Sequence, residues 1–135
     1  MLIRLLALFA APTLLVAAAP LQPGNGLQGE WRNTNNTVHL RVQPCGSAYC
    51  GTVTWASDSQ RAEARKGSGK DLLGSPLLRD LKRGDNGAWR GKVFLPAVNT
   101  TATATVLQVN PNMLRVSGCS LLGLVCKTQH WHRIQ

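Results

Sequence analysis

Apolar and polar residues alternate in short runs along most of the chain. Between residues 37 and 43, the apolar side chains Val38, Leu40 and Val42 occupy every second position. In a longer run, residues 100–109, small or apolar residues alternate with polar ones, mostly threonines. Because successive side chains of a β-strand point to opposite faces, a period of two predicts strands with one buried face.

The same pattern predicts seven strands, at residues 29–33, 37–43, 51–56, 88–95, 100–109, 113–118 and 125–134. Asn, Gly and Pro between them favour tight turns. The Leu-rich segment 72–83 is either an eighth strand or a helical turn, because Pro76 opposes a long helix. Residues 57–70 have no apolar face and contain two glycines, so they are predicted to form a mobile basic loop.

The fold class is predicted to be all-β. A series of seven or eight short antiparallel strands must protect its edges, and closure into a small up-and-down barrel removes the edges altogether. A sandwich of two β-sheets is the alternative. A barrel of about eight strands has an interior that side chains fill or that holds one small ligand. Trp31, Trp55 and Trp89 are predicted to fill much of it, so a large cavity is not expected.

Residues 1–18 have the features of a secretory signal peptide. Arg4 precedes a short apolar run, which small residues follow. The run is shorter than the roughly 20 apolar residues of a transmembrane helix, so cleavage after Ala18 is expected. Residues 19–28 are then an irregular lead-in, and residues 29–135 form one monomeric domain without a membrane span. We expect this domain in the periplasm or outside the cell.

The chain is strongly basic. Its 15 Lys and Arg residues outnumber six acids, and loss of Arg4 with the leader reduces the net charge from +9 to +8. Such a charge attracts anionic partners, although scattered basic residues also keep a small protein soluble. Nucleic acid is not expected, because single-strand binding needs exposed aromatic residues among the cations. The candidate basic surface comprises Arg61, Arg65, Lys66, Lys70, Lys82, Arg83, Arg90 and Lys92.

The four cysteines are predicted to form two disulfides. An even number of cysteines in a small exported domain is typical of disulfide bonding. The pairs Cys45–Cys50 and Cys119–Cys126 each flank a turn between strand-like runs, which favours this connectivity among the three possible. A zinc site usually has two to four residues between paired ligands, whereas four and six intervene here.

Few residues are candidates for catalysis or metal binding. His130 and His132 share one face of the last predicted strand, and together with His39 they are a conceivable metal site. The alternative is that they lie on an exposed outer face. Neither a nucleophile motif nor a phosphate-binding loop occurs. The protein is therefore predicted to bind neither metal nor cofactor, and not to be an enzyme.

The ends of the domain resemble those of lipocalin-like barrels. In such barrels a Gly-x-Trp on the first strand is packed by an Arg from the end of the last strand. Gly29-Glu30-Trp31 and Arg133 stand at the corresponding places. The resemblance implies a cation stacked on an indole at the bottom of the barrel. The candidates for ligand anchors or for closing the barrel are Trp31, Trp55, Trp89, Trp131 and Arg133.

A longer series of motifs resembles the bacterial domain-of-unknown-function family 2147. The motifs are Gly29-Glu30-Trp31, Pro44-Cys45 to Cys50-Gly51, Trp89-Arg90-Gly91-Lys92 and the terminal run from Cys126 to Arg133. The resemblance covers nearly the whole domain and implies an exported lipocalin-like barrel with no assigned catalytic residue. The family usually has an Asp-Pro turn after its central strand, followed by Gly and Tyr. This chain has Phe94-Leu95-Pro96-Ala97 there instead.

The predicted function is that of an exported binding module for a small or amphipathic ligand. The alternative is a surface-interaction or inhibitor-like protein, whose basic residues within 61–92 engage an acidic protein or an anionic envelope polymer. Binding that weakens steeply with added salt would favour the alternative.

Overall fold

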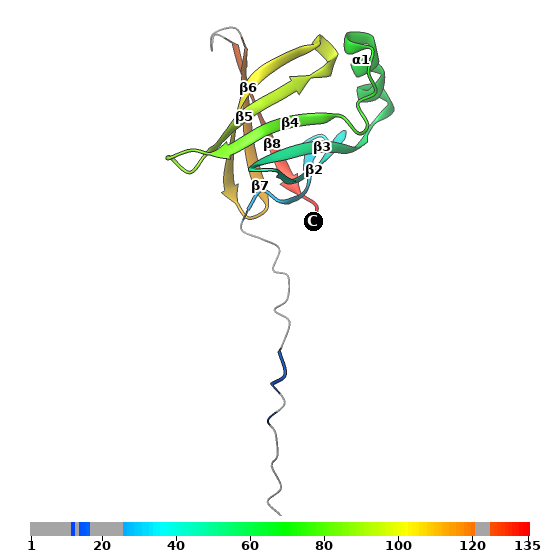
Figure 1. The fold of residues 1–135 in the computed structure, drawn as a ribbon. Coiled ribbons are helices and arrows are strands. Elements are labelled where there is room, and N and C mark those ends of the chain that lie inside the picture. The colour runs from blue at the N-terminus through cyan, green and yellow to red at the C-terminus, as the bar shows by residue number, and fades with distance from the viewer. Residues whose placement is uncertain (1–11, 13, 17–25, 121–124) are drawn as a thin grey trace, which may run out of the picture.

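The chain folds into a closed barrel of eight antiparallel strands. The computed structural model describes residues 12, 14–16, 26–120 and 125–135, so the predicted cleavage site after Ala18 lies outside it. Each strand pairs with the next, and the last pairs with the first (Figure 1). The strands are β1 (Gly29–Asn33), β2 (Val38–Cys45), β3 (Ala48–Ala56), β4 (Pro76–Arg83), β5 (Trp89–Leu95), β6 (Thr100–Asn110), β7 (Met113–Ser120) and β8 (Val125–Arg133).

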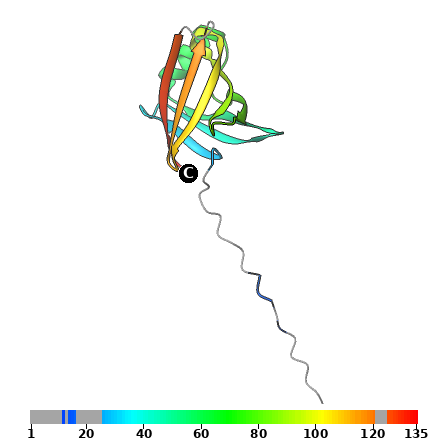
Figure 2. The same cartoon turned by 90° about the vertical axis from the view of Figure 1, so that its left-hand side faces the viewer.

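The up-and-down barrel predicted from the alternating pattern is confirmed, and the sandwich is not. Val38, Leu40 and Val42 are buried on the inner face of β2, and residues 72–83 contain a strand, β4, rather than a helical turn. Figure 2 shows β6, β7 and β8 side by side across one face of the barrel. None of the described helices is long and apolar enough to cross a membrane.

Both predicted disulfides are present in the structure. Cys45 is bonded to Cys50 at the turn between β2 and β3, and Cys119 is bonded to Cys126 between β7 and β8. Each bond therefore fastens a pair of adjacent strands close to the turn that joins them.

A β-bulge in β3 corrects the predicted position of Trp55. Counting alternate residues from Val53 puts Trp55 on the inner face. However, the partner of His39 is Trp55 while the partner of Leu40 is Val53, so Thr54 is an extra residue in β3. A bulge of this kind reverses the alternation that follows it. Trp55 is consequently 44% exposed, and its ring lies against that of His39 outside the barrel, with centroids 4.8 Å apart.

Residues 57–70 form a helix instead of the predicted mobile loop. The helix α1 (Asp58–Ser68) begins at Ser57, whose side chain accepts a hydrogen bond from the Gln60 N–H. It ends at Gly69, which adopts a positive φ and donates its N–H to the Arg65 carbonyl. Asp58 in the first turn and basic residues in the last turn suit the helix dipole. The helix is therefore stabilised at its ends and not by an apolar face.

One end of the barrel is closed by Trp31 and Arg133. The Trp31 ring is fully buried, its Nε1 donates to the Leu27 carbonyl, and the Arg133 guanidinium lies 4.2 Å from its centroid. Arg133 also donates to the carbonyls of Gly26, Gln28 and Pro111. This arrangement confirms the predicted cation–indole stacking, and burial lowers the pKa of Arg133.

Gly29 is required at this closed end. Its φ is +143°, and a Cβ built there would collide with Nη1 of Arg133 and with the Gln135 carbonyl. Glycine alone adopts such a backbone conformation readily. The Gly-x-Trp pattern of the first strand thus has a steric cause as well as a packing one.

Candidate ligand-binding site

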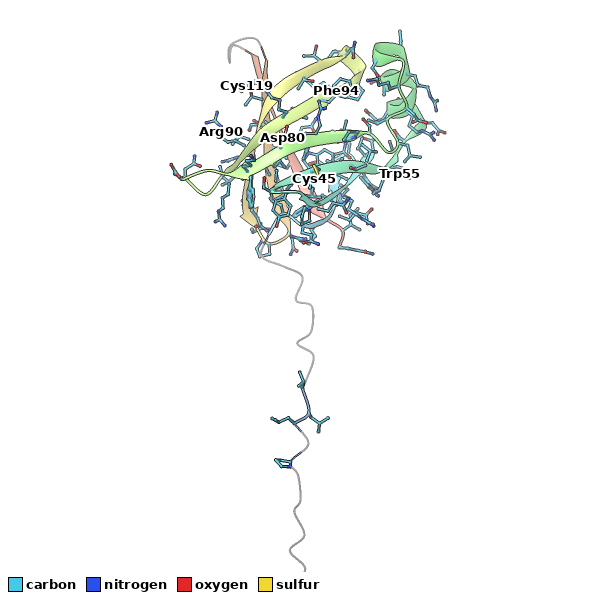
Figure 3. The ribbon with its side chains drawn as sticks, in the orientation of Figure 1. Cys45, Trp55, Asp80, Arg90, Phe94 and Cys119 are labelled. Carbon is cyan, nitrogen blue, oxygen red and sulfur yellow. A yellow bond between two sulfur atoms is a disulfide. The ribbon has the colours of Figure 1, made fainter. Side chains whose placement is uncertain are left out.

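A cavity of about 460 Å³ occupies the opposite end of the barrel. It lies next to α1 and to the turn between β5 and β6, away from the C-terminus (Figure 1). Phe94, one of its lining residues, is labelled near this end of β5 in Figure 3. The volume falls within the range of about 300–1,000 Å³ that is typical of small-molecule sites. The expectation that side chains leave no sizeable cavity is therefore wrong.

The inner part of the cavity is apolar. Side chains of β2, β4, β5, β7 and β8 form it, namely Val38, Leu40, Leu78, Val93, Val116 and Trp131. They point inward because the period of two is kept in these parts of the strands. Burial of a ligand against such side chains contributes about 25 cal/mol for each Å² of apolar surface removed from water.

Two polar side chains of β8, both solvent-exposed, line the cavity. In the pairing with β7, Trp131 faces the buried Leu114, Gln129 faces Val116 and Lys127 faces Gly118. Gln129 and Lys127 therefore share the inner face of β8 with Trp131, and both line the cavity. Neither side chain has a hydrogen bond or an ion pair with any other residue that the structure describes. They are free to bind a polar group of a ligand.

Helix α1 and the short helix η1 (Pro96–Val98) cover the mouth of the cavity. Ala64 on the inner side of α1 is buried, and Gln60 and Glu63 line the mouth. A Cβ at Gly67 would collide with the carbonyl of Ala97. The two helices therefore pack backbone against backbone, which only glycine permits at this point.

An ionic cluster outside the cavity holds α1 to the segment that follows it. Asp71 accepts hydrogen bonds from Arg61 at 2.9 and 3.2 Å and from Arg65 at 3.1 Å, as well as from the Leu73 N–H. The hydrogen bonds from Arg61 and then from the Leu73 N–H hold the pKa of Asp71 far below its usual range. The same contact raises the pKa of Arg61. The cluster links two turns of α1 to the chain leading into β4.

The four tryptophans have four different positions. Trp131 lines the cavity, and Trp31 closes the other end of the barrel. Trp89 is half-buried, with its ring edge-on to that of Tyr49 at 5.1 Å and with Arg83 5.9 Å away. Trp55 lies outside (Figure 3). Of the five predicted anchoring or closing residues, only Trp131 contributes to the cavity.

The eight residues of the candidate basic surface do not form one continuous surface. Arg61 and Arg65 are ion-paired with Asp71. Lys66 lies in the last turn of α1, and the ammonium of Lys70 is 5.8 Å from the Phe94 ring. Lys82, Arg90 and Lys92 form a separate group on the outside of β4 and β5. Arg83 is on the other face of β4, where it pairs with Trp89 and lies 5.9 Å from its ring.

The three histidines lie on the outside of the barrel, where His39 and His132 flank Arg32 and His130 pairs with Arg115 of β7. Arg32 of β1 pairs with His39 on one side and with His132 on the other. His39 is hydrogen-bonded to Asn36 at 2.7 Å, and His132 lies 3.4 Å from the Thr34 hydroxyl. A guanidinium between two imidazoles disfavours a metal cation there.

Lys127 and Gln129 were not among the candidates chosen from the sequence. The signal that would have identified them is the alternation in β8. Once Trp131 is placed inside, every second residue before it must also face inward. Both residues are solvent-exposed, so an inward-facing position does not bury their polar groups.

The family model described as "Uncharacterized protein conserved in bacteria (DUF2147)" matches residues 29–133. The chain belongs to this family. No match is found among the curated proteins. A similar solved structure is that of protein HP1028 from Helicobacter pylori, which is described as belonging to the lipocalin family. It is 16% identical, with a TM-score of 0.66 over 82% of this chain and 84% of that one. At this identity the likeness shows a shared barrel fold.

Proposed function

We propose that this member of the family is an exported binding module, which holds a small amphipathic ligand with an anionic head in the cavity beneath α1. The observation that carries the proposal is a cavity of about 460 Å³ that has an apolar inner part and, in its wall, a lysine without an ion pair to any other described residue. The two disulfides are consistent with export. Lipocalin-like folds that enclose one small ligand support the proposal by analogy.

The division of the cavity into apolar and polar parts favours an amphipathic ligand. Leu40, Leu78 and Trp131 offer contacts for a hydrocarbon tail. The ammonium of Lys127 and the amide of Gln129 offer hydrogen-bond donors to a carboxylate or another anionic head. Gly118 faces Lys127 across the β7–β8 pair, and Val93, which also lines the cavity, lies against it.

We further propose that the protein binds its ligand without catalysis. Among the described residues that line the cavity, Glu63 and Lys127 are the titratable ones. They come from different elements, Glu63 from α1 and Lys127 from β8. The carboxylate of Glu63 repels an anionic group of the ligand near α1. Lys127 is therefore the site for the anionic head of the ligand.

Titration with three eight-carbon probes tests the proposal. We expect octanoate to bind and to shift the NMR signals of Lys127 and Trp131, whereas octan-1-ol binds more weakly and octylamine more weakly still. Lys127→Gln should reduce the affinity for octanoate by about tenfold to a hundredfold, since hydrogen bonds to charged groups contribute about 1.5–3 kcal/mol. It should leave the affinity for octan-1-ol almost unchanged.

Two further measurements locate the site. Val116→Phe adds a ring to the cavity wall and should weaken all three probes, while the matched exposed substitution Val109→Phe should not. Equal affinities for octanoate and octylamine would contradict the role of Lys127. Unchanged binding to Val116→Phe would show that the ligand site is elsewhere.

A further inference from the structure

Four cations form two like-charged pairs on the outer face of β4 and β5. Arg79 of β4 lies directly opposite Lys92 of β5, and Lys82 lies directly opposite Arg90. All four side chains are exposed, and Figure 3 shows Arg90 projecting from the sheet. Directly opposed side chains of like charge destabilise a sheet. The pairs therefore act against the stability of the barrel.

The fold leaves this cationic face without acidic partners. Asp80 is the one acid within the two strands, and it has a positive φ of 55° where the β4–β5 register shifts. Among the described residues, the ion pairs formed are those of Arg41 with Glu30 and of Arg61 and Arg65 with Asp71. On β1 and β2, by contrast, Arg41 is paired across strands with Glu30. Opposite charges are thus paired on one side of the barrel and not on this one.

Hydroxyl groups continue the cationic face on β6. Lys92 pairs with Thr103, and Arg90 pairs with Thr105, so these threonines lie beside the cations on the outside. Adjacent strands are about 4.8 Å apart, and alternate residues are about 7 Å apart along a strand. The result is a grid of positive charges and hydroxyls that is fixed by the sheet. Such a grid suits a chain that carries regularly repeated anionic and hydroxyl groups.

We propose that this cationic face, consisting of Arg79, Lys82, Arg90 and Lys92, binds a linear acidic polysaccharide. This goes beyond the proposed ligand of the cavity, since the face lies on the outside of the barrel. Between residues 79 and 92, no large apolar side chain is exposed. That disfavours both insertion into a membrane and the aromatic anchors of a protein interface. Nucleic acid is disfavoured because no exposed aromatic ring lies among the cations.

Binding of the purified, disulfide-bonded protein to a heparin oligosaccharide tests this proposal. The variant with Arg79, Lys82, Arg90 and Lys92 all changed to Gln should lose at least about tenfold in affinity. The slope of log affinity against log salt should fall by about 3, by analogy with counterion release on nucleic acids. A matched variant with the same charge loss elsewhere should change affinity by less than about threefold, by the same reasoning. It carries Arg32, Arg41, Lys66 and Lys70 changed to Gln.

The single substitution Lys92→Glu gives a second readout. It places a carboxylate opposite Arg79, so it should raise the Tm while it weakens heparin binding. The cavity variant Val116→Phe should leave heparin binding unchanged, which separates this proposal from the previous one.

Several results would overturn the assignment. Equal losses in the two fourfold variants would mean that binding follows net charge alone. A lower Tm for Lys92→Glu would contradict the repulsion between the strands. If oligothymidylate bound more tightly than heparin, and the fourfold β4–β5 variant lost this binding, the ligand of the cationic face would be nucleic acid instead. If phosphatidylglycerol vesicles did so, it would be a membrane surface.

Discussion

The two ends of the barrel use the same eight strands in different ways. At one end, Trp31 fills the space between the strands, and Arg133 fixes it by stacking and by hydrogen bonds to three carbonyls. At the other end, a helix with one buried residue, Ala64, covers a cavity. Trp31 and Leu27, the first two of the largest fully buried side chains, pack at the closed end and do not line the cavity. The α1 end has less packing, which leaves room for a ligand.

The two ends also differ in how easily their contacts can break. At the closed end, where β1 meets β8, the Trp31 ring and its hydrogen bond to Leu27 are buried, and Arg133 stacks on the ring. The contacts that hold α1 are exposed ion pairs and a close approach of Gly67 to Ala97. Exposed ion pairs contribute little to stability, and regions with few buried apolar contacts open locally more easily. We expect α1 to move at lower energetic cost than any strand near Trp31.

The largest predicted effect is at the closed end. Trp31→Ala should lower the free energy of unfolding by about 3–5 kcal/mol, because it leaves a large cavity and removes the ring on which Arg133 stacks. Denaturation by urea measures the change. The matched substitution Trp55→Ala, on the outside of the barrel, should cost about 0.5 kcal/mol. Similar losses for both would mean that the closed end is not the stabilising one.

The closed end was predictable from the sequence because its parts obey simple rules. Alternation in β2 and β6 identified the inner faces, and Gly29, Trp31 and Arg133 matched a known arrangement at the two ends of the domain. Outside the closed end as well, local sequence was informative: both disulfides, including Cys119–Cys126 at the other end of the barrel (Figure 3), were predictable because each pair of cysteines flanks a turn. Local periodicity and sequence separation predicted the inner faces and the disulfides, whereas the stacking of Arg133 on Trp31 was implied by the resemblance to lipocalin-like barrels.

The α1 end was less predictable because its structure depends on features that periodicity does not report. Helix α1 has almost no apolar face, and it is stabilised by Ser57, by Gly69 and by the ion pairs to Asp71. The inward position of Lys127 follows only after the face of Trp131 is known. Similarly, one extra residue at Thr54 reversed the direction of Trp55. The cavity exists because these separate local features combine.

A smaller effect is expected where α1 meets η1. Alanine has a higher helix propensity than glycine by about 1 kcal/mol, so Gly67→Ala would stabilise a helix that had space around it. Here its Cβ would collide with the Ala97 carbonyl, and we expect a loss of about 1 kcal/mol from overpacking instead. Hydrogen exchange of the α1 amides should become faster. The control Ser59→Ala, on the exposed side of the helix, should slightly slow this exchange. Slower exchange in Gly67→Ala would contradict the close packing of α1 on η1.

The smallest effect concerns the ion pairs of Asp71 and depends on pH. The folded-state pKa of Asp71 is lowered, chiefly by the hydrogen bond from Arg61, so its contribution to stability is present above the unfolded-state pKa of about 3.9. This contribution is lost as the pH falls through the lower folded-state pKa. We expect the NMR signals of α1 to change between about pH 4 and the acid limit of the fold, before those of the strands around Trp31. Asp71→Asn should have a loosened α1 already at pH 7 and should lack this transition, whereas Asp85→Asn, in the turn between β4 and β5, should keep it.

A transition of equal size in Asp71→Asn would mean that other carboxylates hold the helix. It would also remove the contrast between a mobile α1 end and a fixed closed end, because α1 would then depend on groups shared with the rest of the barrel.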